Sequence, residues 1–151
     1  MRAETVSDPY DLERFVEAQA GLYRQVCAEL AAGEKRSHWM WFIFPQLAGL
    51  GGSPMARRYA IASLAQARAY LAHEPLGARL LECTALVNAV TARPVGEIFG
   101  YPDDLKFRSC MTLFAHAAPD AARAAPFRAA LQKYFAGEED SLTRERLTAA
   151  S

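Results

Sequence analysis

Proline placement is the feature that most limits how this chain can fold. Proline lacks a backbone N–H and has a fixed φ, so it suits the first turn of a helix and disrupts a helix interior. Seven of the eight prolines lie where a helix could begin, and Pro45 is better placed to end an element. The seven are Pro9, Pro54, Pro75, Pro94, Pro102, Pro119 and Pro126. The pattern predicts a chain built from many helices.

Apolar spacing and glycine stops give the predicted helices their lengths. The longest is expected over residues 9–32, where apolar residues recur at three- and four-residue steps up to Gly33. Ser53, Ser63 and either Asp140 or Ser141 are suitable caps for later helices. The shorter helices are predicted over residues 54–61, 64–73, 75–91, 94–99, 102–117, 125–136 and 140–148.

The segment 38–44 is apolar on every side, so its periodicity does not separate a buried strand from a buried helix. Its aromatic residues favour a strand, but a lone strand would leave its backbone unpaired, so we predict a helix. No alternating strand pattern is found elsewhere. We therefore expect an all-α fold, a single multihelical bundle over residues 1–151, with one long N-terminal helix and several short ones. Residues 1–7 and 149–151 are expected to fray.

Charge and cysteine content narrow the classes of partner. Seventeen Lys and Arg balance seventeen Asp and Glu, which argues against nucleic acid and against an anionic membrane surface. No apolar run approaches the roughly 18 residues of a membrane span, and no signal peptide is visible. Three widely spaced cysteines are typical of reduced thiols, so we expect a cytoplasmic protein. The histidines are isolated, so no metal site is predicted, and no motif indicates a cofactor. The sequence leaves the oligomeric state open, with a monomer favoured.

The first candidate site is the segment 35–46. It places Lys35 and His38 beside Trp39 and Trp41, with Gln46 at its far end. Indole rings could stack on or wall in a planar heterocycle, and the Gln46 amide could bind the edge of that heterocycle. The alternative is an aromatic core helix whose polar flanks point to water.

The second candidate site is the predicted helix that starts near residue 103. Ser109 and Thr112 fall on a small polar face, and Arg108 and Lys106 could meet phosphate together with Lys35 of the first segment. Lys106 could equally pair with an aspartate or be a solvated surface lysine. Acidic residues such as Asp104 also favour the positive end of a helix, which is the alternative reading for that residue.

We expect the two segments to pack together. Each carries polar groups that its own helix does not need, and a shared site would account for both. His38 and Asp104 are the acid–base candidates, because a histidine titrates near neutrality and a carboxylate accepts a proton. In this arrangement Asp104 would orient His38 or pair with Lys106.

The cysteines have different expected roles. Cys27 and Cys83 lie on apolar faces and are predicted to be core thiols. Cys110 shares a helical face with Lys106 one turn earlier, and a nearby ammonium would favour its thiolate.

Six motifs together resemble the bacterial family known as domain of unknown function 1810. They are SDPYDLERFV (7–16), SHWMWFIFPQ (37–46), GLG (49–51), EIFG (97–100), DDLK (103–106) and SCMTLF (109–114). The resemblance spans nearly the whole chain and implies a compact all-helical fold with no established activity. Some members carry the label calpastatin, which does not fit, because calpastatins are disordered and this chain is 52% hydrophobic. The family usually has serine where this chain has Cys110, which puts in doubt a hydroxyl nucleophile there.

Two functions remain from the sequence. The first is a cytoplasmic protein that binds or processes a nucleotide-like small molecule. The alternative is a non-enzymatic adaptor that binds a protein partner through an exposed apolar patch.

Overall fold

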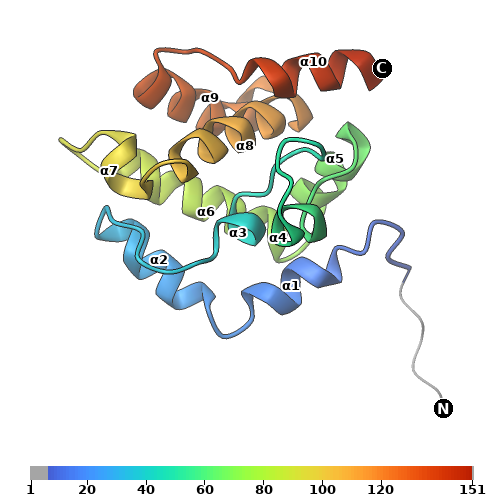
Figure 1. Cartoon of the computed structure of the whole chain (residues 1–151), viewed down its shortest axis with the longest axis horizontal. Helices are drawn as coiled ribbons and strands as arrows, with labels where there is room; N and C mark the ends of the chain where they lie inside the picture. The colour runs from blue at the N-terminus through green and yellow to red at the C-terminus, as the bar shows by residue number, and fades with distance from the viewer. Residues whose placement is uncertain (1–6, 151) are drawn as a thin grey trace.

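Ten α-helices form the chain in this computed structural model, which describes residues 7–150 (Figure 1). Within those residues the extended backbone pairs only at one isolated bridge, between Leu47 and Ile61. The all-α prediction is therefore confirmed. The helices are α1 Glu13–Gln19, α2 Tyr23–Ala31, α3 Met40–Ile43, α4 Pro54–Arg58, α5 Leu64–Ala72, α6 Leu76–Ala89, α7 Val95–Phe99, α8 Asp103–Ala117, α9 Ala121–Phe135 and α10 Ser141–Ala150.

The predicted long N-terminal helix is wrong, because the chain breaks between α1 and α2. Ala20 is extended, with ψ 130°, and Gly21 has φ +79°, a left-handed conformation that glycine adopts without a Cβ clash. Just before the break, the Gln19 side chain donates a hydrogen bond to the carbonyl of Phe42 at 2.8 Å. The chain therefore turns at Gly21, and tertiary contacts stabilise this turn. The apolar periodicity alone predicts that the helix continues through it.

Helix starts follow the capping side chains more closely than the prolines. Ser53, Ser63 and Asp140 each accept a backbone N–H from the first turn of α4, α5 and α10, as predicted. The predicted start of α9 near residue 125 is wrong. Asp120 caps that helix by accepting the N–H of Arg123 at 2.8 Å, which leaves Pro126 inside the helix.

The segment 38–44 contains the helix that we predict, although α3 has only four residues. After α3 the chain extends to the isolated bridge, where Ala48 donates to the carbonyl of Ile61 and Ile61 donates to the carbonyl of Gln46, both at 2.8 Å. This bridge places residues 46–48 beside the chain that enters α5.

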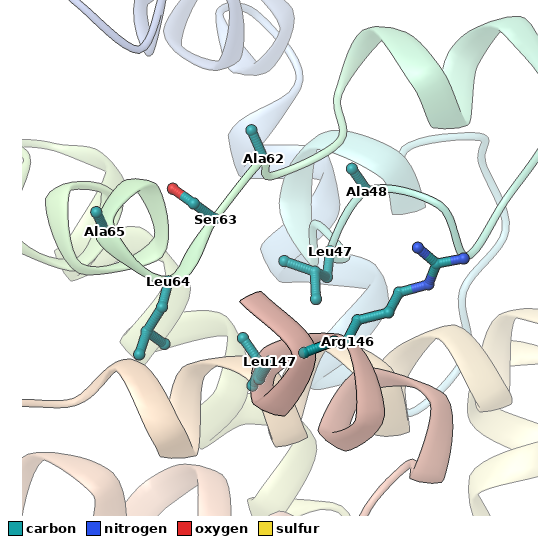
Figure 2. A pocket seen from close by; sticks show the side chains of 9 residues that line it. Leu47, Ala48, Ala62, Ser63, Leu64, Ala65, Arg146 and Leu147 are labelled. Atoms are coloured by element: carbon teal, nitrogen blue, oxygen red, sulfur yellow. The ribbon is translucent and has the colours of Figure 1, made fainter. Parts of the chain in front are cut away.

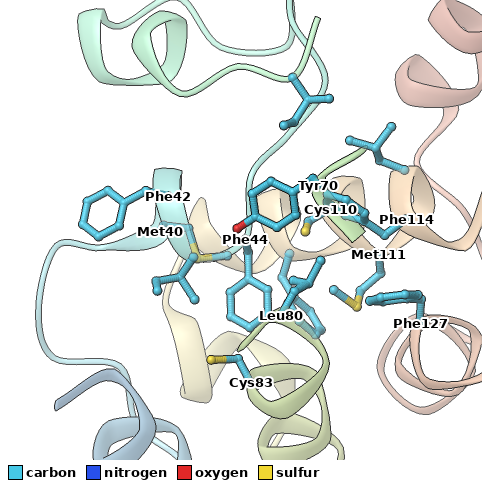
Figure 3. Close-up of a cluster of buried hydrophobic side chains, with 14 of the residues drawn as sticks. Met40, Phe42, Phe44, Tyr70, Leu80, Cys83, Cys110, Met111, Phe114 and Phe127 are labelled. Atoms are coloured by element: carbon cyan, nitrogen blue, oxygen red, sulfur yellow. The ribbon is translucent and has the colours of Figure 1, made fainter. Parts of the chain in front are cut away.

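The hydrophobic core surrounds α8. Residues from Phe107 to Ala117 are almost all buried there, and α8 packs against α5, α7, α9 and α10. Phe44 from the segment after α3 contacts the rings of Phe99 and Phe107 edge-on, with centroids 5.8 and 5.1 Å apart. Figure 3 shows Phe44, Tyr70 and Cys110 in this cluster. The core thus joins the aromatic segment to α8.

Two further predictions concern fraying at the chain ends and the absence of a membrane span. Fraying is expected for residues 1–7 and 149–151, of which 1–6 and 151 lie outside the described residues. Within the described residues, α10 continues to Ala150. None of the helices in residues 7–150 combines the length and hydropathy that crossing a bilayer would require.

Candidate functional site

The loop between α2 and α3 is fixed by one buried carboxylate, Glu29. Its Oε1 accepts the N–H groups of Arg36 and Ser37 and the indole Nε1–H of Trp39, at 2.7, 3.1 and 2.9 Å. Its Oε2 accepts the hydroxyl of Ser37 at 2.5 Å and the amide of Gln25 at 3.0 Å. Burial alone would raise the pKa of Glu29, but these bonds lower it to about 2. The carboxylate is therefore charged and fully engaged at neutral pH.

Trp39 belongs to the hydrophobic core. It is 1% exposed, and its indole N–H is committed to Glu29. Its ring also packs beside Phe44, with centroids 6.2 Å apart. Stacking of a ligand on Trp39 is thus excluded by burial, whereas Trp41 is only half-buried.

Two lysines from distant parts of the chain converge on Asp103. The Nζ of Lys35 lies 3.0 Å from Asp103 Oδ2, and the Nζ of Lys106 lies 3.3 Å from Oδ1. The Lys35 side chain is 8% exposed, whereas that of Lys106 is 27% exposed. Asp103 therefore links the loop before α3 to the first turn of α8, and Lys106 is the more solvated of its two cations.

The same lysines lie over the two indole rings. Lys35 Nζ is 5.2 Å from the Trp39 ring centroid, and Lys106 Nζ is 5.6 Å from that of Trp41. The structure thus places the segment 35–46 against the start of α8. We call the group formed by Lys35, Trp41, Asp103 and Lys106 the Trp41 surface.

Three of the predicted residues do not join this group. His38 is exposed, and no hydrogen bond or ion pair links it to another described residue. Asp104 accepts the N–H of Leu105, so the lysine partner is Asp103. Gln46 contributes its backbone carbonyl to the isolated bridge.

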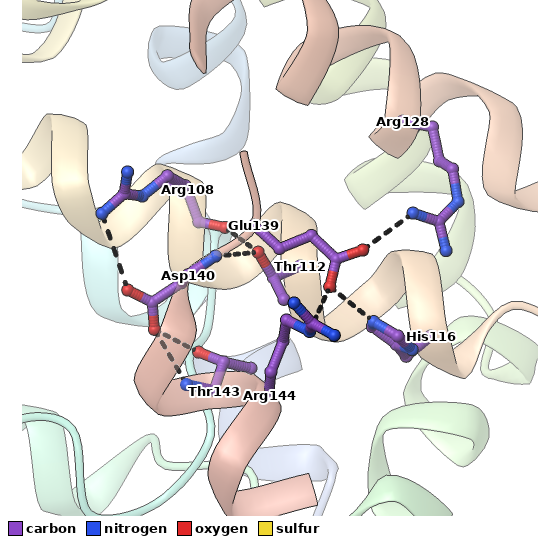
Figure 4. Close-up of polar contacts among 8 residues, drawn as sticks. All are labelled: Arg108, Thr112, His116, Arg128, Glu139, Asp140, Thr143 and Arg144. Carbon is purple, nitrogen blue, oxygen red and sulfur yellow. Dashed lines mark hydrogen bonds and ion pairs between the residues drawn. The ribbon is translucent and has the colours of Figure 1, made fainter. Parts of the chain in front are cut away.

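Arg108, Ser109 and Thr112 are used elsewhere on α8. The hydroxyl of Ser109 donates to the carbonyl of Leu105, and that of Thr112 donates to the carbonyl of Arg108. Thr112 Oγ1 also accepts the N–H of Asp140 at 2.9 Å, and Arg108 lies 4.0 Å from an Asp140 carboxylate oxygen (Figure 4). These groups fix the start of α10.

A polar cluster around Glu139, which sequence reasoning missed, borders them (Figure 4). The Glu139 carboxylate lies 2.8 Å from His116 Nε2, 3.0 Å from Arg128 and 3.3 Å from Arg144. Partial burial would raise its pKa, but the bonds from His116 and Arg128 lower it. Its partners come from three helices, so no sequence spacing indicates the cluster.

The predicted activation of Cys110 is wrong. Its side chain is completely buried, and burial raises the pKa of the thiol well above its ordinary value. Cys83 is buried as predicted, whereas Cys27 is half-buried. Within the described residues, no three His, Cys, Asp or Glu side chains gather as a metal ligand set would.

Comparison with known proteins shows the family and the fold. A family model described as a protein of unknown function, DUF1810, matches residues 9–147. A crystal structure of the conserved hypothetical protein Rv1873 from Mycobacterium tuberculosis is similar, with 58% identity and a TM-score of 0.90, over 93% of this chain and 99% of that one. No curated protein gives a significant match. The chain therefore belongs to the DUF1810 family, whose function is unknown.

Proposed function

We propose that this protein binds a small anionic ligand with a flat ring, of the nucleotide class, at the Trp41 surface. The observation that supports this most directly is the place of Lys106. The Lys106 ammonium lies over the Trp41 ring and also forms an ion pair with Asp103. The Lys106 side chain is nevertheless 27% exposed. A base could stack on the accessible part of the indole, and a phosphate could replace the water around Lys106.

The other members of the Trp41 surface have supporting roles. Lys35 is too buried to meet a ligand directly, and it orients Asp103 from the opposite side. The resulting charge is two cations to one carboxylate, which favours an anion. Because His38 and Asp104 make no contact with each other in the described part of the chain, we assign binding and no reaction.

The compartment that we propose is the cytoplasm. Cys27, Cys83 and Cys110 are all free thiols. Free thiols are the usual state in a reducing compartment, which supports this placement.

Tryptophan fluorescence tests the proposal, because Trp39 and Trp41 are the two tryptophans of the chain. Titration with ADP should quench the emission, and Trp41→Phe should abolish that quenching while Trp39 still emits. Lys106→Met should weaken binding by roughly tenfold, as expected for one charged hydrogen bond. Arg24→Gln, an exposed change on α2, is the charge-matched control. Quenching that persists in Trp41→Phe, or calorimetry without binding heat at millimolar ADP, would contradict the proposal.

One observation favours a second function, that of an adaptor. Tyr101 is 82% exposed and Leu105 is 41% exposed, both at the start of α8. Exposed aromatic and aliphatic side chains together are typical of protein-binding surfaces. Under this reading, a stoichiometric protein partner should co-purify with the wild-type chain, and the pair Tyr101→Ser and Leu105→Ser should release it. ADP should then have no effect.

A further inference from the structure

An apolar pocket of about 650 Å³ lies between α10, the start of α5 and the chain at the isolated bridge (Figure 2). It is distinct from the Trp41 surface, because none of its lining residues belongs to that group. Its volume is within the range of about 300–1,000 Å³ that is usual for small-molecule sites. The pocket is lined by Leu47, Ala48, Ala62, Ser63, Leu64, Ala65, Arg146, Leu147 and Ala149.

Three leucines form the apolar wall of the pocket, and the small side chains of its alanines leave its volume open. Leu47 is buried, and Leu64 and Leu147 are half-buried at the edge of the core. Most of the other lining residues are alanine, so no long side chain fills the volume between these helices. Ser63 is the one hydroxyl in the lining, and it accepts the N–H of Gln66 as the cap of α5. The pocket therefore offers an apolar surface that could bind the hydrocarbon part of a ligand, with few polar groups in its lining.

Arg146 supplies the charge at the edge of the pocket. Figure 2 shows its side chain extending from α10 to the side of Ala48, apart from the side where Leu64 lies. It can lie there because residue 49 is glycine. A Cβ at Gly49 would come within 2.5 Å of a guanidinium nitrogen. Among the residues that the structure describes, the Arg146 side chain has no hydrogen bond or ion pair, in contrast to that of Arg144 two residues earlier, which pairs with Glu139.

We propose that this pocket binds a small monocarboxylic acid with an aliphatic body. The leucines and alanines would cover the hydrocarbon, and the Arg146 guanidinium would bind the carboxylate through two parallel N–H bonds. One unpaired cation balances one negative charge, which favours a carboxylate over the nearly dianionic phosphate monoester. The inference is independent of the Trp41 surface and of its ligand.

Octanoate and octan-1-ol test this proposal, because they share a chain and differ in charge. In two-dimensional NMR titrations of the full chain, octanoate should shift the amides of residues 62–65 and 146–149 and should bind at least about tenfold more tightly than octanol. Arg146→Gln should remove that preference and leave octanol binding unchanged. Arg24→Gln, an equal change of charge outside the lining, should leave both affinities unchanged.

A second variant tests the location of the ligand. Ala62→Phe should fill the pocket and abolish the binding of both molecules. Because Arg146 and Ala62 are exposed, both variants should keep the wild-type circular dichroism spectrum. The proposal fails if octanoate does not bind at millimolar concentration or if Arg146→Gln leaves its affinity unchanged. It also fails if light scattering shows a dimer that Ala62→Phe dissociates, because a second copy would then be the occupant.

Discussion

Glu29 and Glu139 both tie a loop to the helices beside it, but they use donors of different kinds. Glu29 is 8% exposed and accepts bonds from backbone amides, a hydroxyl, an amide and an indole, all of them neutral groups. Glu139 is bonded by His116, Arg128 and Arg144, whose side chains are 37–65% exposed. The loop at Glu29 is stabilised by hydrogen bonds from neutral donors to a buried carboxylate. The loop at Glu139 is stabilised by ion pairs with solvent-exposed side chains.

This difference bears on both proposed sites. The Glu29 bonds order residues 36–39, and that loop presents Lys35 and leads into the half-buried Trp41. The Glu139 cluster fixes the approach to α10, the helix that carries Arg146. Solvent weakens exposed ion pairs far more than buried bonds to neutral donors. We therefore expect the loop before α3 to be the more rigid of the two and the seat of α10 to respond to salt.

Glu29→Gln should destabilise the protein more than any other substitution considered for the two carboxylates. The substitution keeps the shape but leaves one acceptor oxygen in place of two, so an NH₂ group faces at least two of the five bonded donors, and the other bonds lose the negative charge. We expect a loss of about 4 kcal/mol in the free energy of unfolding, measured with urea at neutral pH. Glu17→Gln on the exposed face of α1 is the control and should change stability by less than about 0.5 kcal/mol. A similar small change for Glu29→Gln would mean that the loop is not held by this carboxylate.

The second prediction concerns acid. The folded pKa of Glu29 is about 2, below its ordinary value of 4.5, so its contribution is complete above pH 4.5 and is lost as the pH falls toward 2. The difference in unfolding free energy between wild type and Glu29→Gln should therefore shrink by about 3 kcal/mol over that interval. Urea unfolding at a series of pH values measures it. A difference that stays constant with pH would show that the charged form is not the one stabilised.

The third prediction is smaller and concerns Glu139→Gln. Its partners are partly solvated, so the substitution should cost about 1 kcal/mol at neutral pH and low salt. The adjacent Glu138 is exposed and has no side-chain partner in the described part of the chain, so Glu138→Gln is a closely matched control. A cost near that of Glu29→Gln would remove the distinction between the two regions.

The smallest effect is the salt dependence that separates the two carboxylates. In about 1 M NaCl, where the Debye length is about 3 Å, the cost of Glu139→Gln should fall by roughly 0.5 kcal/mol. The cost of Glu29→Gln should stay the same within error, because its donors are neutral and the carboxylate itself is only 8% exposed. Equal salt dependence of both variants would contradict the comparison.

The candidate site was predictable in part. The aromatic segment and the start of α8 each showed clustered polar residues, and the two segments do pack together. The ion pair between Lys35 and Asp103 joins them, whereas the groups that motivated the prediction, such as His38 and Asp104, do not pair across. The partner of Lys106 was not predictable, because Asp103 and Asp104 are neighbours in a first turn and differ in direction by about 100° around the helix. Only the position of Lys35, brought in from another segment, selects Asp103.

Local features of the fold follow from neighbouring residues alone. Ser53, Ser63 and Asp140 cap their helices because a cap bonds to an N–H only three residues away, so neighbouring residues decide it. The same holds for Gly33, which follows α2 with φ +76°.

Tertiary structure alone decided the rest. The corner at Gly21, the buried Trp39 bonded to Glu29 and the unpaired Arg146 beside Gly49 depend on segments that meet only after the helices pack. Each of these features depends on the free energy of packing across the whole core. A break in a helix or the burial of an indole is stabilising only if another element of the fold packs against it. Local spacing contains no information on that partner, and so the fold class was predictable while the engagement of each polar side chain was not.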